Sequence, residues 1–298
     1  MYYDEKRIIQ KTWYFCKKSG TMTIDDIIKA ALEEDIGDGD HTTLATVPAD
    51  AKGKVKMFAK QSGIVSGTEV AKRVFTLLDP DTNVEIFIQD GNPIKKDDVI
   101  MLISGSDRTL LTGERLALNF IQRMSGIATF THQMVESIKG TSCTILDTRK
   151  TTPCNRLVEK MAVKAGGADN HRIGLYDMIM IKDNHVDFAG GVQKAIQSVQ
   201  DYLKRNNKDL KIEIEVRNFD ELNEVLTTGG VHRIMLDNFS PEEIRKALRL
   251  INGKYETEAS GGIGIDNIRR YAETGVDFIS VGALTHQIRS LDISVTTL

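Results

Sequence analysis

Four short apolar runs in the second half of the chain each end in charged residues. The runs are ILDTRK, MIMIKDN, IEIEVR and RIMLDN, and their charged ends are Asp147, Arg149, Lys150, Lys182, Glu215 and Asp237. A charge at the end of a buried strand costs free energy unless a partner or a ligand meets it, so the repeated arrangement indicates a binding or catalytic site. We expect that site to lie where the strand ends converge.

The cations at these strand ends have different uses. Arg149 offers a planar fork that suits a carboxylate or a phosphate, and Lys150 beside it offers a compact point charge. His171 and Arg172 follow in the segment NHRIGL. Lys182 ends an apolar strand, a position typical of either an anion clamp or a Schiff-base nucleophile. A single basic pair on a loop is most often solvated surface, so the argument depends on the whole set.

The candidate mouth has more cations than carboxylates. Its cations are Arg149, Lys150, Arg172 and Lys182, with His171 also available. Glu215 and Asp237 could pair internally with two of these groups and leave an inert mouth. Cations still exceed carboxylates after full pairing, so the sequence predicts an anionic ligand.

Two glycine segments follow the last two strands and point to phosphate. They are SGGIG at residues 260–264 and SVGALTH at residues 280–286, each between a strand and a helix whose amides could cradle a phosphate. Tight turns also need glycine, but barrels often bind phosphate at these strands. Carboxylates near an anionic ligand suggest Mg²⁺, held by Glu215 and Asp237 through water. No His and Cys cluster offers a site for a transition metal.

Strands and helices alternate from Cys143 to the end, which predicts parallel strands with helices outside. The expected strands are CTILDT, DMIMIKD, KIEIEV, RIMLD, YETEAS and FISVG. A closed or partly open α/β barrel and a doubly wound sheet both fit. We favour the barrel because polar groups recur at every strand end, as expected where all the loops surround one mouth.

The first half predicts a smaller α+β unit. Helices are expected over residues 23–37 and 68–78, with a polar loop GDGDHTT and the strands GKVKMFAK, NVEIFIQDG and DVIMLISGS. A long helical block starts near Thr109 and is interrupted at Ser125 and Gly126. The first twenty residues form an added arm, whose Trp13, Tyr14 and Phe15 are expected to pack on the body of the protein or on another subunit.

Composition limits the class of protein. The 298 residues are 41% hydrophobic and 27% charged, with a net charge of −3, so neither a nucleic-acid partner nor an anionic membrane is indicated. Cys16, Cys143 and Cys154 form no CxxC pair and favour a reducing cytoplasm. No apolar run approaches the roughly 20 residues needed to span a bilayer, and the N-terminus resembles no secretory signal.

Many ordered blocks of the chain resemble motifs of the quinolinate phosphoribosyltransferase family, also called carboxylating nicotinate-nucleotide pyrophosphorylase. They include EEDIGDGDHTT, GERLALNFIQRMSGIAT, LDTRKTTP, EKMAVKAGGADNHRIGLYDMIMIKDNH, IEVRN, MLDN, EASGGI and SVGALTH. The resemblance implies an N-terminal α/β sandwich domain at 21–135, an open α/β barrel at 136–285 and a C-terminal tail at 286–298 that packs on the N-terminal domain, while the arm at 1–20 finds no match in the family. Cys154 and Asn155 depart from the family, which commonly has a glycine followed by a larger residue.

The resemblance also implies roles for single residues. Quinolinate would be gripped by Arg149, His171 and Arg172, with Arg115 entering from a neighbouring subunit of a homodimer or a larger assembly of dimers. Lys150 and Lys182 would bridge the two substrates, while Glu215 and Asp237 would address the ribose and Mg²⁺ of phosphoribosyl pyrophosphate. The remaining substrate contacts expected around the strand ends are Thr148, Ser260, Gly261, Gly262, Val281, Gly282 and Ala283.

The implied reaction transfers the phosphoribosyl group to the quinolinate nitrogen with loss of CO₂ and pyrophosphate, and it gives nicotinate mononucleotide for NAD biosynthesis. Three alternatives stay open. One is a Schiff-base aldolase that uses Lys182, and another is a related phosphoribosyltransferase with a different acidic acceptor. The third is a noncatalytic subunit that only binds anions.

Overall fold

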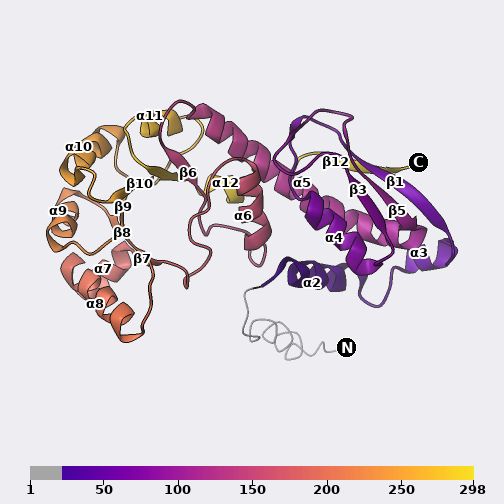
Figure 1. Cartoon of the computed structure of the whole chain (residues 1–298), viewed down its shortest axis with the longest axis horizontal. Helices are drawn as coiled ribbons and strands as arrows, with labels where there is room; N and C mark the ends of the chain where they lie inside the picture. Colours follow the sequence, from indigo (N-terminus) through magenta and orange to yellow (C-terminus); the bar gives the residue numbers. More distant parts are fainter. Residues whose placement is uncertain (1–21) are drawn as a thin grey trace, which may run out of the picture.

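The computed structural model describes residues 22–298, so the predicted packing of Trp13, Tyr14 and Phe15 lies outside the described part. Figure 1 shows two bodies joined by one long helix: a curved array of strands with helices on its outside, and a smaller sheet with helices on one face. The mixed α/β class with a parallel-stranded barrel, predicted from the strand and helix alternation, is confirmed.

The smaller body is built on a four-stranded antiparallel sheet in the order β12-β1-β5-β3. Its strands are β1 (Lys52–Ala59), β3 (Asn83–Ile86), β5 (Val99–Ser106) and β12 (Ile293–Thr297), with a separate pair, β2 (Gly63–Ile64) and β4 (Pro93–Ile94). Side chains of β1 alternate in exposure, so Val55, Met57 and Ala59 face the core. The last strand in the chain, β12, pairs along β1, the first strand of the sheet.

Three helices complete this body. They are α2 (Ile24–Ile36), α3 (His41–Thr46) and α4 (Thr68–Leu78). Helix α2 begins with a capping box in which Thr23 and Asp26 bond each other's backbone amides. The prediction of a loop at GDGDHTT was wrong in its second half, because the Asp40 side chain accepts a hydrogen bond from the Thr43 backbone N–H and starts α3 there.

Helix α5 (Asp107–Ser137) connects the two bodies (Figure 1). The predicted interruption at Ser125 and Gly126 was wrong, because the helix runs without a break for 31 residues. Both residues are instead contact points. The Ser125 hydroxyl bonds Ser66, and a Cβ on Gly126 would come within 2.2 Å of the Arg289 carbonyl oxygen. Small residues there let other segments approach the helix closely.

The larger body holds a six-stranded parallel sheet in the order β6-β11-β10-β9-β8-β7. Its strands are β6 (Thr144–Leu146), β7 (Ile179–Ile181), β8 (Ile212–Val216), β9 (Arg233–Asp237), β10 (Glu256–Ser260) and β11 (Phe278–Ser280). The sheet curves into a barrel that is open between its edge strands β6 and β7 (Figure 1). Beside β6, a single bridge joins Leu146 to Asp169.

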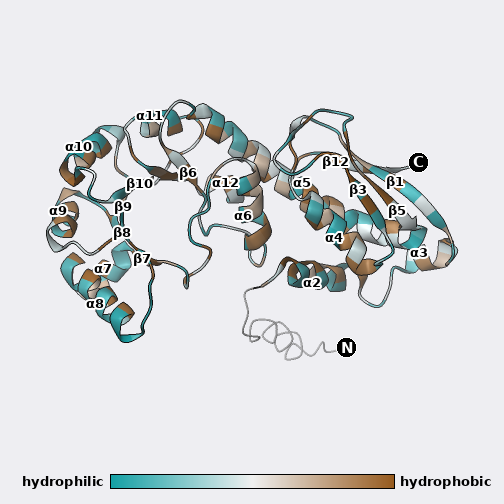
Figure 2. Ribbon diagram, in the orientation of Figure 1, coloured by the Kyte–Doolittle hydropathy of each residue, from teal (hydrophilic) through white to brown (hydrophobic). Residues whose placement is uncertain are grey.

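Helices cover the outside of this sheet. They are α6 (Arg156–Ala165), α7 (Asp183–Ala189), α8 (Val192–Arg205), α9 (Phe219–Thr228), α10 (Pro241–Ile251), α11 (Ile268–Ala272) and α12 (Ala283–His286). Figure 2 shows both hydrophilic and hydrophobic residues along these helices. Buried residues such as Ile196, Leu222 and Ile244 belong to the core, which explains the amphipathic spacing. None of the helices between residues 22 and 298 is both long enough and apolar enough to cross a membrane.

Candidate active site at the strand ends

The loop after β6 is held next to the glycine segment after β11. The Thr285 hydroxyl donates a hydrogen bond to the Lys150 carbonyl oxygen at 2.9 Å. A Cβ added to Gly282 would lie 3.0 Å from Cδ of Lys150 and 3.0 Å from Nε2 of His286, so the glycine leaves room for the lysine stem to pass closely. The lysine and the second predicted phosphate segment therefore belong to one place.

Arg149 and Arg172 lie close enough for their charges to interact. Burial, followed by the charge of Arg149, lowers the pKa of Arg172. Arg172 donates one hydrogen bond at 3.1 Å to the Met178 carbonyl oxygen, while the buried Nε of Arg149 has no hydrogen-bond partner among the described residues. Two like charges with unused donors create a strong local preference for an anion.

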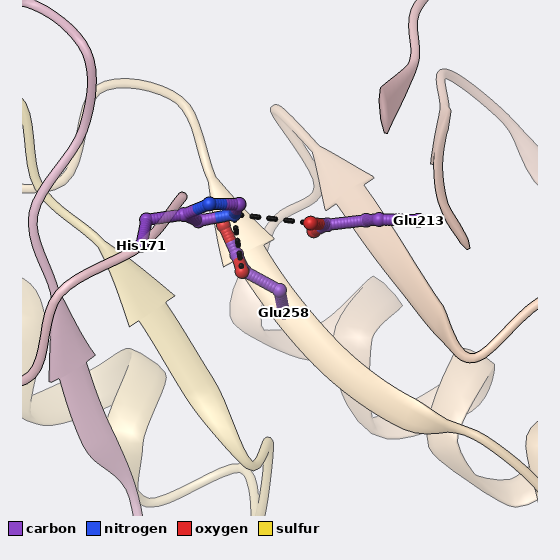
Figure 3. Close-up of side chains that lie close together, drawn as sticks. All are labelled: His171, Glu213 and Glu258. Carbon is purple, nitrogen blue, oxygen red and sulfur yellow. Dashed lines mark ion pairs between the residues drawn. The ribbon is translucent and has the colours of Figure 1, made fainter. Parts of the chain in front are cut away.

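His171 faces the barrel interior, where it meets two buried carboxylates. Its Nε2 lies 3.0 Å from Oε2 of Glu213 and 3.3 Å from Oε2 of Glu258. Figure 3 shows the imidazole pointing between the two glutamates, which come from different strands. Arg233 on β9 adds a further cation, with Nη1 3.0 Å from the same Glu258 oxygen. We call His171, Glu213, Glu258 and Arg233 the interior cluster.

Two contacts oppose each other in setting the charge of His171. The Arg172 backbone N–H donates to Nδ1 at 2.7 Å, which favours a neutral ring. Burial also lowers the pKa of His171, but the two glutamates outweigh it and raise the pKa to about 9. We assign the protonated ring, in which Nδ1 also carries a proton and the Arg172 N–H must turn away from it, because two full charges in a buried place outweigh one backbone dipole. Burial and Glu258 in turn raise the pKa of Glu213 to about 7.

The interior cluster corrects the charge count made from the sequence. Glu213, Glu258 and Arg233 were missed, and His171 is matched by protein carboxylates. Strand alternation could have found Glu213, which stands two residues before Glu215 and so shares its face. These ligand atoms lie within 4.8 Å of one another, a spacing that a metal ion could also use. The cations His171 and Arg233 already match the two carboxylates, so the cluster needs no ion.

Lys182, Glu215 and Asp237 come together at the ends of three neighbouring strands. Nζ of Lys182 lies 2.7 Å from Oε2 of Glu215. Burial, and then the charge of Glu215, raises the pKa of Asp237, whose Oδ2 accepts a hydrogen bond from Asn238 at 2.6 Å. One ammonium therefore stands against two interacting carboxylates, and this side of the mouth can accept a further positive charge.

The sequence predicts that the first glycine segment, residues 260–264, leads directly into a helix. This prediction was wrong. Gly261 and Gly262 have φ angles of 97° and 61°, and helix α11 begins only at Ile268. The Asn267 side chain accepts from the Gly264 N–H and donates to the Gly262 carbonyl oxygen. A Cβ on Gly261 would lie 2.2 Å from the Asn238 side chain, so the segment packs against the residue after Asp237. Ser260 ends β10 beside Asp237 in the sheet register.

The other predicted residues occupy varied positions. Thr148 accepts a hydrogen bond from the Lys150 N–H, and Val281 is buried with its N–H bonded to the Leu146 carbonyl oxygen. Ala283 begins α12. Arg115 lies exposed on α5, and among residues 22–298 no hydrogen bond or ion pair joins it to the barrel mouth.

Asp147 has a structural task. It forms a buried ion pair with Lys160 of α6 and accepts a hydrogen bond from the His171 N–H at 2.8 Å. Lys160 also donates to the His171 carbonyl oxygen at 2.9 Å. The pair therefore holds the histidine segment beside β6. A cavity of about 330 Å³ lies next to this segment, lined by residues that include His171, Arg172, Arg233 and Phe278.

Models of one protein family match nearly the whole chain. The model described as quinolinate phosphoribosyl transferase, N-terminal domain, matches residues 40–125, and the corresponding C-terminal domain matches residues 127–296. The boundary between the two matches falls inside α5, the helix that joins the two bodies.

Named relatives and solved structures agree with this match. Quinolinate phosphoribosyltransferase [decarboxylating] 1b of Nicotiana tabacum is 43% identical over 290 residues, which cover 92% of this chain and 82% of the relative. A probable nicotinate-nucleotide pyrophosphorylase [carboxylating] of Bacillus subtilis is 40% identical over 262 residues, covering 88% and 89%. The crystal structure of NadC from Streptococcus pyogenes superimposes with a TM-score of 0.87 at 42% identity, covering 94% of this chain and 100% of that one.

Proposed function

Because the chain belongs to the quinolinate phosphoribosyltransferase family, we propose that it transfers the phosphoribosyl group of phosphoribosyl pyrophosphate to quinolinate with loss of CO₂. The product is nicotinate mononucleotide, a precursor of NAD. The enzyme class is a pentosyltransferase, the carboxylating nicotinate-nucleotide diphosphorylase.

The observation that carries the acceptor assignment is the pair of arginines. Arg149 and Arg172 repel each other, and the buried Arg149 Nε lacks a hydrogen-bond partner in the described part of the chain. A pyridine dicarboxylate supplies two anionic groups on one rigid ring, so it satisfies both forks at once. A monocarboxylate such as nicotinate leaves one of them without a partner.

The donor is proposed to bind across Lys150, Lys182 and the two glycine segments. Lys150 passes over Gly282, which supports a contact with phosphate there. Lys182 lies against Glu215, next to Asp237, which suits the hydroxyl-rich ribose. These groups are spread over the strand ends of the whole sheet, with Lys150 after one edge strand, β6, and Lys182 after the other, β7.

Magnesium fits the carboxylates on this side of the mouth. Glu215 and Asp237 interact unfavourably, as the raised pKa of Asp237 indicates, and a hard cation with oxygen ligands relieves that repulsion. When bound there through water, Mg²⁺ supplies positive charge that favours the departing pyrophosphate. Its presence is part of the proposal.

In the proposed reaction the quinolinate nitrogen attacks C1 of the ribose as the bond to pyrophosphate breaks. Arg149 and Arg172 orient the ring, Lys150 offsets negative charge on the leaving group, and Glu215 stabilises positive charge on the sugar. The new bond makes the ring nitrogen cationic. The ring therefore accepts the electron pair released with CO₂, and the same carbon then takes up a proton.

The alternative of a Schiff-base aldolase has weaker support. Imine formation requires the nitrogen of Lys182 to attack a carbonyl carbon, whereas this atom is engaged with the Glu215 carboxylate at 2.7 Å. The aldolase also gives no use to the arginine pair.

The assembly and the location belong to the same proposal. A homodimer would let the exposed Arg115 serve the acceptor pocket of a second copy, and a hexamer of dimers extends the same contact. Cys143 and Cys154 are both free thiols, which supports a reducing compartment such as the cytoplasm.

The test is mass spectrometry of the purified protein after incubation with phosphoribosyl pyrophosphate, Mg²⁺ and either quinolinate or nicotinate. We expect nicotinate mononucleotide and CO₂ from quinolinate only. Equal product from nicotinate contradicts the carboxylating reaction. Donor binding without either product keeps the phosphoribosyl site and removes the acceptor assignment.

A further inference from the structure

One hydrogen-bond network joins helix α5 to two segments of the barrel, the loop that carries Lys150 and helix α12, which follows Gly282. At its centre, Nη2 of Arg123 on α5 lies 3.0 Å from Oε1 of Glu159 on α6. The side chain of Glu159 is 1% exposed and that of Arg123 is 32% exposed. A buried carboxylate paired with a partly exposed guanidinium is costly to break, because removal of one partner leaves the other without compensation.

Glu159 holds the loop that carries the cations. Its Oε2 accepts a hydrogen bond from the Thr152 backbone N–H at 3.1 Å, and its Oε1 accepts one from the Thr152 hydroxyl at 2.8 Å. Thr152 stands only two residues after Lys150. Both carboxylate oxygens of a buried side chain thus fix the path of this loop.

Arg123 holds the second segment and links it to the first. Its Nη2 donates a hydrogen bond at 2.6 Å to the carbonyl oxygen of Thr285 in α12. The Thr285 hydroxyl donates at 2.9 Å to the Lys150 carbonyl oxygen. Helix α12 begins directly after Gly282. Arg123 therefore fixes both Gly282 and Lys150 relative to α5, the helix that carries this arginine.

We propose that Arg123 and Glu159 are positioning residues that set the spacing between Lys150 and the Gly282 segment, and thereby the affinity for phosphoribosyl pyrophosphate. This inference rests on the proposed function and adds residues that act through Lys150. Arg115 stands eight residues before Arg123 on α5, roughly 12 Å along the helix. The network therefore also connects the loop of one site to the helix that carries Arg115.

The experiment is a double-mutant cycle. Binding of phosphoribosyl pyrophosphate is measured by titration calorimetry, together with kcat and KM, for Arg123→Ala, Lys150→Ala and the double variant. We expect Arg123→Ala to raise Kd and KM for this substrate on the order of tenfold or more, since small misplacement of a binding group is costly. In the Lys150→Ala background the further change should be less than about threefold, because contacting residues that act together are not additive.

Two variants control for general damage. Arg73→Ala removes a two-bond ion pair with Asp25 in the smaller body and should leave Kd within about twofold of the unaltered protein. Arg123→Lys keeps the charge and should recover part of the affinity. The inference is overturned if Arg123→Ala folds and has an unchanged Kd. It is also overturned if Arg123→Ala causes the same loss of affinity in the unaltered protein and in the Lys150→Ala variant.

A third variant covers the case in which Arg123→Ala fails to fold. Thr152→Val removes only the hydroxyl that donates to Glu159, on an exposed residue, and should raise Kd for the same substrate severalfold. An unchanged Kd in this variant also counts against the network.

The unaltered protein distinguishes failure of the proposed function from failure of the positioning role. If it binds phosphoribosyl pyrophosphate without converting quinolinate, the proposed function fails, while the Kd values of the variants still test the positioning role.

Discussion

The guanidinium groups of Arg149 and Arg172 repel each other in the protein and attract a substrate with two carboxylates. Neither group has a carboxylate partner among the ion pairs of residues 22–298. The free energy for binding a dianion therefore comes from charges that are already desolvated and fixed in place.

Arg172→Ala should lower kcat/KM for quinolinate by one to three decades, about 1.4 to 4 kcal/mol, because a charged donor in a partly buried site is lost. Steady-state kinetics at saturating phosphoribosyl pyrophosphate measures this effect. Arg245→Ala is the matched control, since it removes an exposed arginine whose pair with Glu242 spans 3.7 Å. Near-normal quinolinate turnover in Arg172→Ala would take this residue out of the acceptor pocket.

The interior cluster predicts a pH dependence of folding stability. The pKa of His171 is raised from 6.5 to about 9 in the folded protein. The imidazolium thus contributes stability that is fully present below pH 6.5 and is lost as the pH rises through 9. Urea unfolding should show a decline of as much as about 3 kcal/mol between these pH values. In His171→Asn the part of the decline that belongs to the imidazolium should be absent, and what remains belongs to Glu213, whose pKa is raised to about 7.

His41 provides the comparison for this pH experiment. It is an exposed histidine, 3.4 Å from Asp38, so His41→Asn should keep the decline seen in the unaltered protein. A free energy of unfolding that stays level from pH 6.5 to 9 in the unaltered protein would show that His171 is neutral in the folded state.

Strand-end residues were predictable because their spacing is local. Lys182, Glu215 and Asp237 each follow an apolar run, and the structure brings these three together. Glu258 was missed because no partner is near it in sequence: His171 reaches it across the barrel. Asp147 was interpreted as a site residue, but its partner Lys160 lies on the helix that follows, where helix packing decides the contact.

At the scale of elements, the entry to α6 carries backbone strain. Cys154 is exposed and has a φ angle of 64°, in the left-handed region that side chains with a Cβ disfavour. Resemblance to the family suggests glycine at this position, and the structure supplies the physical reason. A residue without a Cβ adopts this turn at no steric cost.

Cys154→Gly should therefore raise the free energy of unfolding by a few tenths to about 1 kcal/mol, the relieved strain exceeding the added flexibility of the unfolded chain. Urea denaturation measures the change. Asn252→Gly is the control, because Asn252 has a φ of 50° at the end of α10 and asparagine tolerates this region. A loss of stability in Cys154→Gly would mean that the cysteine side chain makes a contact that outweighs the strain.

Most helices and strands followed from periodicity, and the errors have identifiable causes. Ser125 and Gly126 suggest a break by composition, yet close packing against other segments of the chain keeps α5 continuous. Helix α3 depends on one cap, Asp40, in a stretch whose polarity predicts a loop. In α5 contacts with distant segments decide the structure, whereas in α3 a local cap outweighs the polar composition.

At the scale of the whole molecule, the exposed position of Arg115 on α5 makes the shared site testable. Chains with Arg115→Ala and chains with Arg172→Ala should each be nearly inactive alone. In randomly mixed dimers about half are hybrids, and each hybrid has one site with both arginines, so activity should recover to about a quarter of the unaltered level. Assays of the mixture after dissociation and reassociation measure this recovery.

The dimer content of the mixture is verified by native mass spectrometry. Hybrid dimers with no more activity than the average of the two parents would contradict a site that combines Arg172 of one chain with Arg115 of the other. Unaltered protein that is monomeric at assay concentrations and fully active would exclude sharing altogether.

The position of β12 has a consequence for how the chain is made. Strand β12, residues 293–297, covers one side of β1 in the first sheet and is made only after all the strands of the barrel. Until then β1 exposes unpaired backbone groups along one side, where another chain could add a strand. The smaller body, although begun before the barrel, is completed only after the barrel has been made, and a chain truncated before Ile293 leaves that side of β1 open for aggregation.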